Sequence, residues 1–155
     1  MRRMRYLKAV VAMVLIAAML CGSAMAASRD AKVFSPSMKV YNKNRQTIAS
    51  LSRGTSFTVT KISGNWAKIS YGGKTGYAQM KDIVFNKRVK AVSTKETSIK
   101  FVTKSSYKKG TYYTGTLAKG VTLYIAGVKG DYYLFYNESG SAMGYVKKSA
   151  VRKAG

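Results

Sequence analysis

The sequence predicts an all-β protein with two tandem small β-barrels of five to six short antiparallel strands each, behind an N-terminal signal-peptide helix. Three observations carry this prediction. The chain repeats itself, its short alternating apolar runs are separated by closely spaced turn signals, and no segment after the N-terminus shows helical periodicity over a useful length. A duplicated small β module is therefore expected, without a large catalytic domain.

The N-terminus has the pattern of a secretory signal peptide over residues 1–26. Its basic region contains Arg2, Arg3, Arg5 and Lys8. An apolar run follows over 9–20, and the small residues around Ala24 and Ala26 predict cleavage after Ala26. An uncleaved N-terminal anchor remains the alternative. Lipidation of Cys21 is disfavoured, because the bulky Leu20 precedes it where a small residue is required.

Two copies of one module make up the rest of the chain. Residues 51–69 match residues 117–135 at a constant offset of 66 positions (51 to 117). Past the next turn the offset is 68, and before Leu51 it is 61, which aligns 37–41 with 98–102. The insertions thus fall between candidate strands, where surface loops absorb extra residues at little cost. We expect domains at 27–87 and 88–155.

Alternation places the strands of the first copy. The expected runs are 31–34, 38–41, 56–62, 66–71 and 74–79, followed by one turn into Ile83. In the run 66–71, alternation puts Trp66 and Lys68 on one side and Ala67, Ile69 and Tyr71 on the other.

Glycine-containing turns separate these runs. Ser63-Gly64-Asn65 and Gly72-Gly73 are the two hairpin signals, because glycine and asparagine tolerate positive φ. The second copy repeats the order, with hairpins at 129–131 and 137–140. The linker 85–98 is basic and is expected to pair partly as an edge strand.

The first copy resembles the bacterial SH3-like (SH3b) domain family. The matching motifs are Leu51-x-x-Gly54-Thr55, Gly64-Asn65-Trp66-Ala67-Lys68-Ile69 and Gly73-Lys74-Thr75-Gly76-Tyr77-Ala78. The resemblance implies SH3-like barrels that are exported and usually hold cell-wall enzymes on peptidoglycan. The second copy departs from the pattern, with Tyr132 in place of Trp66, Leu134 in place of Lys68 and an insertion within 104–114. The first copy lacks an Arg-Ser-Gly-Pro segment that many members carry in their first long loop.

The residue types exclude most catalytic chemistry. The chain has no histidine, and its one cysteine, Cys21, lies within the expected signal peptide. Ser-His-Asp, Cys-His and His-ligated zinc sites are therefore impossible in the mature chain. The five acids are scattered singly, and Asp131 and Glu138 each fall in a hairpin turn. We expect no enzyme activity, no metal and no cofactor.

Charge and aromatic side chains indicate binding instead. A net charge of +23 favours an anionic partner, the alternative being a solvated basic surface. Most of the twelve tyrosines fall between residues 107 and 145, and tyrosine suits peptide or sugar recognition. The candidate ligand-binding residues are Tyr41 and Trp66 in copy one and Tyr107, Tyr112, Tyr113 and Tyr132 in copy two. Copy two is favoured as the site. For Trp66, Tyr77 and Tyr145 we expect packing in the barrel ahead of a binding role, since a small barrel needs bulky, partly buried side chains.

The sequence thus favours a secreted, non-catalytic protein that associates with the cell wall. Its expected partners are peptidoglycan stem peptides or anionic wall polymers such as teichoic acid. The alternative is an extracellular adaptor that docks an envelope enzyme or another protein. Export argues against nucleic acid, and the membrane is expected to matter only through an uncleaved signal peptide.

Overall fold

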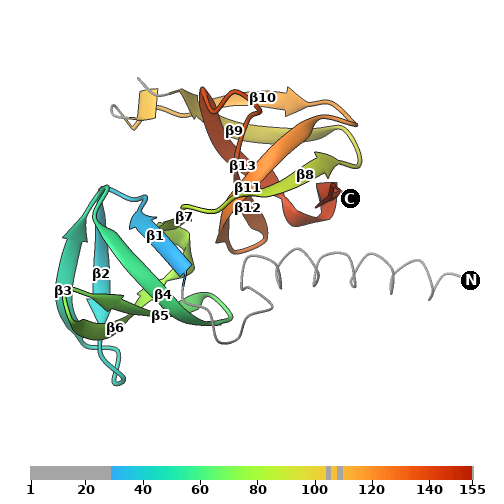
Figure 1. The fold of residues 1–155 in the computed structure, drawn as a ribbon. Coiled ribbons are helices and arrows are strands. Elements are labelled where there is room, and N and C mark those ends of the chain that lie inside the picture. The colour runs from blue at the N-terminus through green and yellow to red at the C-terminus, as the bar shows by residue number, and fades with distance from the viewer. Residues whose placement is uncertain (1–28, 104–105, 108–109, 155) are drawn as a thin grey trace, which may run out of the picture. The chain divides into compact units, whose positions relative to one another are not determined.

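The computed structural model describes residues 29–103, 106–107 and 110–154, so the predicted signal peptide lies outside the described residues. The described chain divides into two compact units, one with residues 29–87 and 127–130 and the other with residues 88–126 and 131–154. Each unit is built on a seven-stranded antiparallel sheet that curls around its own core (Figure 1). The prediction of an all-β chain with two tandem small barrels is confirmed.

The first unit has its strands in the order β3-β2-β6-β5-β4-β1-β7. Their bounds are β1 Arg29–Val33, β2 Ser37–Tyr41, β3 Thr47–Ser52, β4 Ser56–Ser63, β5 Trp66–Tyr71, β6 Lys74–Gln79 and β7 Ile83–Phe85, with a single 3-10 turn, η1 Met80–Asp82, before β7. The β5–β6 hairpin turns through Gly72 and Gly73, at φ of 50° and 77°. Both glycines occupy the left-handed region that a two-residue turn between twisted strands requires. The turn is therefore formed as its sequence predicts.

The second unit repeats this topology strand for strand, in the order β10-β9-β13-β12-β11-β8-β14. Its strands are β8 Val89–Ser93, β9 Thr97–Thr103, β10 Tyr113–Leu117, β11 Thr122–Lys129, β12 Tyr132–Tyr136, β13 Ala142–Lys147 and β14 Val151–Lys153, with η2 Lys148–Ala150 before the last. The repeat seen in the sequence is thus a repeat of the whole fold.

Alternate residues of the inner strands form each core, as a half-buried sheet requires. The fully buried side chains of the first unit include Ala31, Met38, Val40, Ala67, Ile69, Ala78 and Ile83. Those of the second include Val102, Leu123, Ile125, Tyr133, Val146 and Ala150. Gly76 is buried where a β-carbon would overlap the Val40 side chain, so glycine at this position lets β6 lie close against its neighbour β2.

Two features differ from the sequence-based expectation. Each sheet has seven strands where five to six were predicted, because β3 and β10 also pair as edge strands. The expectation that the linker 85–98 supplies an edge strand is wrong. Its residues 89–93 form β8, which pairs with β11 on one side and β14 on the other. The linker strand is therefore an inner strand of the second unit.

The pairing registers also correct the alignment of the two copies. Met38 lies opposite Leu51 in the first unit, and Thr97 lies opposite Leu117 in the second. Leu51 and Leu117 are equivalent, so Met38 corresponds to Thr97, two positions away from Ile99, its partner in the sequence alignment. A slip of two residues keeps every side chain on its face, which is why alternation alone could not detect it.

Candidate binding site

The candidate site lies on the outer face of the sheet in the first unit, around β5. Ala67 and Ile69 of this strand are fully buried, whereas Trp66 is half-buried and Lys68 is exposed. Tyr71 is partly buried and packs against the core. The two faces of β5 are therefore divided as its alternating sequence predicts, and Trp66 and Lys68 face outward together.

Cross-strand pairing extends this outer face into a row of side chains over four strands. Lys61 of β4 lies opposite Lys68 of β5, and Lys68 lies opposite Tyr77 of β6. Tyr77 in turn lies opposite Tyr41 of β2. Residues directly opposite on one face have their β-carbons about 4.5–5.5 Å apart, so these side chains are immediate neighbours. Residues distant in sequence thus meet in one surface row of two cations and two phenols.

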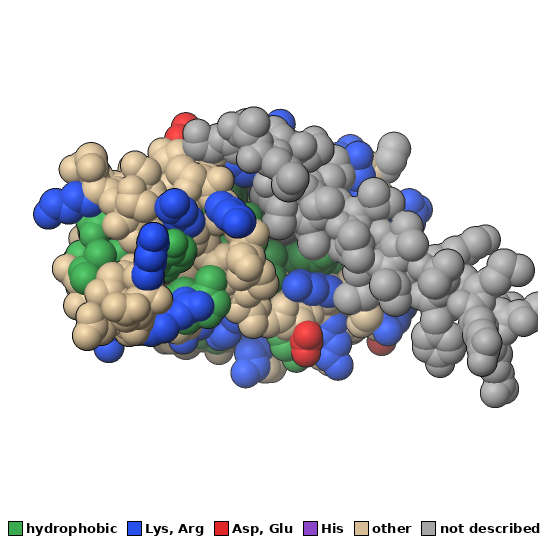
Figure 2. All heavy atoms as spheres, turned by 90° about the horizontal axis from the view of Figure 1, so that it is seen from below, with side chains coloured by type: hydrophobic (Ala, Val, Ile, Leu, Met, Phe, Trp, Pro, Cys, Tyr) green, Lys and Arg blue, Asp and Glu red, His purple; other side chains and the backbone are tan. Residues whose placement is uncertain are grey.

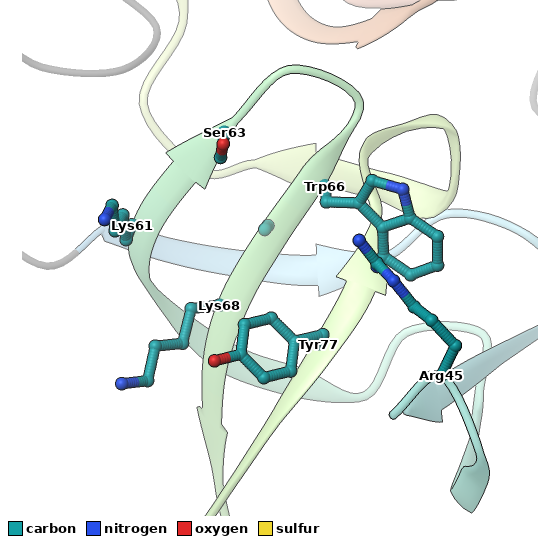
Figure 3. A pocket seen from close by; sticks show the side chains of 7 residues that line it. Arg45, Lys61, Ser63, Trp66, Lys68 and Tyr77 are labelled. Atoms are coloured by element: carbon teal, nitrogen blue, oxygen red, sulfur yellow. The ribbon is translucent and has the colours of Figure 1, made fainter. Parts of the chain in front are cut away.

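A hollow of about 330 Å³ opens over this row (Figure 3). It is lined by Arg45, Lys61, Ser63, Trp66, Ala67, Lys68 and Tyr77. In Figure 3 the ring of Tyr77 lies beside Lys68, while Arg45 reaches the indole of Trp66 from the loop between β2 and β3. The lining thus combines aromatic walls with three cations and contains no acid.

Arg45 is held in place by its loop. Asn42 organises the turn, since its side-chain oxygen accepts hydrogen bonds from the backbone N–H groups of Asn44 at 2.9 Å and Gln46 at 3.0 Å. The Asn42 carbonyl also accepts a bond from the Arg45 N–H at 3.1 Å. Arg45 itself has φ of 63°, the one positive value among the described non-glycine residues. Strain of this kind is stored where surrounding contacts impose it, often at binding sites.

The consequence of this loop conformation is a stacked cluster at one wall of the hollow. The Arg45 guanidinium lies 3.6 Å from the centroid of the Trp66 ring. The Tyr41 ring meets the same indole edge-on, with centroids 5.4 Å apart and planes at 77°. Such cation–π and aromatic pairs each contribute about 0.5–1.5 kcal/mol. Stacking fixes the plane of the guanidinium and leaves its N–H edge available for a ligand.

The cations of the hollow are not neutralised locally. Within the described part of the chain, neither Lys61 nor Lys68 nor the Arg45 guanidinium has a carboxylate partner. Like charges directly opposite each other on a sheet are destabilising. Figure 2 shows Lys and Arg side chains spread over the face it displays, with few acids among them. The hollow therefore holds three unneutralised cations between aromatic walls.

The corresponding face of the second unit is built differently. Tyr132 replaces Trp66 and is 40% exposed, with Lys147 opposite it. Leu134 replaces Lys68, is fully buried and lies opposite Tyr145. The ring of Tyr112 stacks on that of Tyr145, with centroids 6.4 Å apart and planes at 28°. An aromatic stack and a leucine thus occupy the place of the cationic row.

The other tyrosine candidates of the second unit lie in separate places. Tyr113 is 48% exposed at the start of β10, and its ring packs at 5.7 Å against Phe101 of β9. Tyr107 is half-buried, and its carbonyl accepts a hydrogen bond from the Gly110 N–H at 3.1 Å. Tyr41 and Trp66 are the sequence candidates that the structure brings together. We therefore place the candidate site in the first unit, although the sequence favoured the second.

A further arginine–aromatic pair lies in the second unit. The Arg88 guanidinium stacks 3.7 Å from the ring centroid of Tyr136. Burial raises the pKa of Tyr136 above its ordinary value, and the nearby Arg88 charge offsets part of that shift. The phenol is therefore neutral at physiological pH, and the pair has the character of a packing contact.

Trp66, Tyr77 and Tyr145, for which the sequence predicts packing in the barrel, are all half-buried. They lie outside the fully buried interior, whose largest side chains include Tyr133, Phe85 and Met38. Sequence reasoning missed Arg45, Lys61, Lys68 and Tyr77 as site residues. For Lys68 a signal existed, because alternation already placed it beside Trp66. For Arg45 no periodic signal existed, since its position depends on the conformation of a five-residue loop.

Two observations bear on other kinds of site. No group of three or more His, Cys, Asp and Glu side chains that could hold a metal ion occurs within residues 29–103, 106–107 and 110–154. Over the same residues, no helix has the length and apolarity needed to cross a membrane.

Comparison with known proteins gives distant similarity only. No protein-family model matches the chain, and no curated protein matches it. Among solved structures, the chain is similar to NlpC1 from Trichomonas vaginalis at 13% identity and a TM-score of 0.36, covering 86% of this chain and 49% of that one. It is also similar to NlpC2 from the same organism, at 11% identity and a TM-score of 0.36, covering 83% and 49%. The chain spans about half the length of these two structures.

Proposed function

We propose that this protein is an exported, non-catalytic binding protein that attaches to the cell wall through the hollow of its first unit. The observation that carries the proposal is the cluster of Arg45 stacked on Trp66 beside the unneutralised pair Lys61 and Lys68. Cations placed against each other without acids cost stability in the free protein. An anionic ligand would offset that cost, so the arrangement favours a binding role.

The composition of the chain supports a wall polymer as the ligand. Its net charge of +23 attracts polyanions from a distance and makes their binding sensitive to salt. Peptidoglycan stem peptides carry carboxylates, and teichoic acids carry phosphates, so either offers groups that the hollow would hold. The signal-peptide pattern at 1–26 supports export to the compartment where these polymers occur.

The absence of catalysis is part of the proposal. The chain has no histidine, and the described acids take structural or turn positions. Asp82, for example, accepts a hydrogen bond from the Ser35 hydroxyl at 2.5 Å next to η1. Without a positioned base or nucleophile, the hollow would hold a ligand and not transform it.

Co-sedimentation of the mature protein with purified cell walls tests this function. We expect walls to retain the protein at low salt, with retention falling as salt rises. Trp66→Ala and Arg45→Ala should each reduce retention, while Tyr132→Ala, the corresponding position of the second unit, should leave it unchanged. Walls stripped of anionic polymers would separate peptidoglycan from teichoic acid. No retention of the wild-type protein at any salt concentration would overturn the proposal, and a protein partner recovered instead would favour the adaptor.

A further inference from the structure

We propose that the hollow of the first unit binds a sugar ring that bears an oxyanion, either a carboxylate or a phosphate. This inference rests on the proposed function and names the ligand class of the same site. It follows from three properties of the hollow, namely which cations line it, what its aromatic rings offer and which strands form its floor.

The oxyanion would lie between the two lysines. Lys61 and Lys68 lie directly opposite each other on adjacent inner strands, so their flexible side chains can bring both ammonium groups to one anionic group. Arg45 supplies a third donor from the opposite wall, with its plane already fixed by Trp66. Hydrogen bonds between charged donors and carboxylates or phosphates are about twice as strong as neutral ones. This half of the hollow therefore selects for an anion.

The ring of the ligand would lie against the aromatic side chains. Tyr77 is the direct neighbour of Lys68 on the next strand, and Trp66 also lines the hollow (Figure 3). The Tyr41 ring contacts the indole of Trp66 edge-on. The apolar face of a sugar ring packs on such rings, while the Tyr77 phenol and the Ser63 hydroxyl can bond its hydroxyl groups. At about 330 Å³ the hollow lies at the small end of ligand pockets, which suits one or two sugar units.

The strand order argues against a peptide that binds as an added strand. The floor of the hollow is formed by β4, β5 and β6, which are inner strands with sheet neighbours on both sides. Peptides that add to a sheet gain affinity from the main-chain groups of an edge strand, and here those groups are already paired. Recognition in the hollow must therefore come from side chains, which suits an anionic sugar.

The second unit provides an internal contrast. It has the same strand order, but Leu134 stands in place of Lys68, and Tyr112 covers Tyr145, the counterpart of Tyr77. The cationic row is lost while the fold is kept. We therefore expect the anionic-sugar site in the first unit alone.

The chain's single tryptophan makes a direct assay possible, because Trp66 lines the hollow. The mature protein would be titrated at constant ionic strength with glucuronate, glucose 6-phosphate and glucose, and with acetate and inorganic phosphate as anions without a ring. We expect saturable fluorescence changes for the two anionic sugars, with affinities at least about tenfold above those for glucose and for the free anions. The relative affinities for glucuronate and for glucose 6-phosphate show whether the hollow prefers a carboxylate or a phosphate.

Substitutions separate a shaped site from general charge. Lys68→Gln and Lys61→Gln should each weaken anionic-sugar binding about tenfold, as the loss of one charged hydrogen bond implies. Lys32→Gln removes the same charge from β1, outside the hollow, and should leave binding within about twofold. Lys68→Gln relieves a repulsive pair, so the variant is expected to fold.

Several outcomes would overturn this inference. Equal fluorescence responses to glucose and glucuronate would show that the hollow has no anion subsite. Equal losses of affinity in Lys32→Gln and Lys68→Gln would show that the anion is attracted by the overall charge of the protein and not by the hollow. Tighter binding of an acidic dipeptide than of either anionic sugar would assign the hollow to peptides. If walls retain the protein through Trp66 while no anionic sugar binds, the proposed wall attachment stands and this ligand class fails. If the sugars bind but walls do not retain the protein, the ligand class stands and the proposed wall attachment fails.

Discussion

Replacing Arg45 with glycine and, in parallel, with alanine separates backbone strain from ligand binding at the hollow. Arg45 has φ of 63°, where only glycine is free of steric cost. Both replacements remove the guanidinium that stacks on Trp66. The two variants differ in backbone strain, because alanine keeps a β-carbon in the left-handed region and glycine has none.

The size of the difference follows from two opposing terms. A residue with a β-carbon at this φ costs roughly 1–2 kcal/mol, while glycine loses up to about 1 kcal/mol more backbone entropy on folding than alanine. Arg45→Gly should therefore be more stable than Arg45→Ala, by about 0.5–1 kcal/mol. For a unit of about 60 residues this corresponds to a Tm roughly 2–8 °C higher. Wall retention should fall equally in both variants, since neither carries the cation.

Thermal unfolding followed by Trp66 fluorescence is the assay, because the single tryptophan reports on the first unit. The order of the two variants is the decisive result. At an ordinary negative φ, alanine would be the more stable replacement by about 0.5–1 kcal/mol. An alanine variant that melts above the glycine variant would refute the strained loop, and with it the account of how Arg45 reaches the indole.

Three further predictions follow from the same geometry. Lys68→Gln should relieve the repulsion from Lys61, so the free protein should be more stable by a few tenths of a kcal/mol in urea unfolding, while wall retention weakens. A loss of stability would contradict the placement of the two lysines opposite each other. Gly144→Ala should destabilise the second unit by roughly 1–3 kcal/mol in thermal unfolding by circular dichroism, because the new methyl would overlap the Lys100 carbonyl. An unchanged transition would be inconsistent with the close approach of the paired strands β13 and β9. Tyr132→Ala should change stability by less than about 0.5 kcal/mol, as expected for a side chain that is 40% exposed, and a larger loss would assign Tyr132 to packing.

Much of the fold was accessible from the sequence because the inner strands obey simple rules. Trp66–Tyr71 alternates, and Gly72-Gly73 fixes the turn after it, so strand faces and hairpin both follow from local pattern. The edge strand β3 escaped prediction because its sequence lacks this contrast, with an exposed isoleucine, Ile48, among small and polar residues. The inner position of β8 depends on pairing with β11 and β14, which lie later in the sequence.

The site was only partly accessible for the same reason. Alternation placed Trp66 and Lys68 on one face, but the meeting of Lys61, Tyr77 and Tyr41 with them depends on the registers of four strands. A bulge between Val59 and Lys61 sets one of those registers.

The preference for the second unit came from counting tyrosines. That count could not show that Tyr112 already stacks on a tyrosine of its own unit, where Tyr145 takes the place of Tyr77. Nor could it show that the shorter loop of the first unit carries a cation to Trp66. Side-chain type was therefore a weaker guide than the pairing of strands.

The most direct test of the central claim compares two double variants of equal charge in wall co-sedimentation. Lys61→Gln/Lys68→Gln removes two charges from the hollow, and Lys32→Gln/Lys81→Gln removes two exposed charges of the same unit outside it. If the hollow attaches the protein to the wall, the first pair should lower retention at moderate salt by roughly tenfold or more, while the second pair changes it little. Equal losses in the two double variants would show that net charge alone holds the protein to the wall.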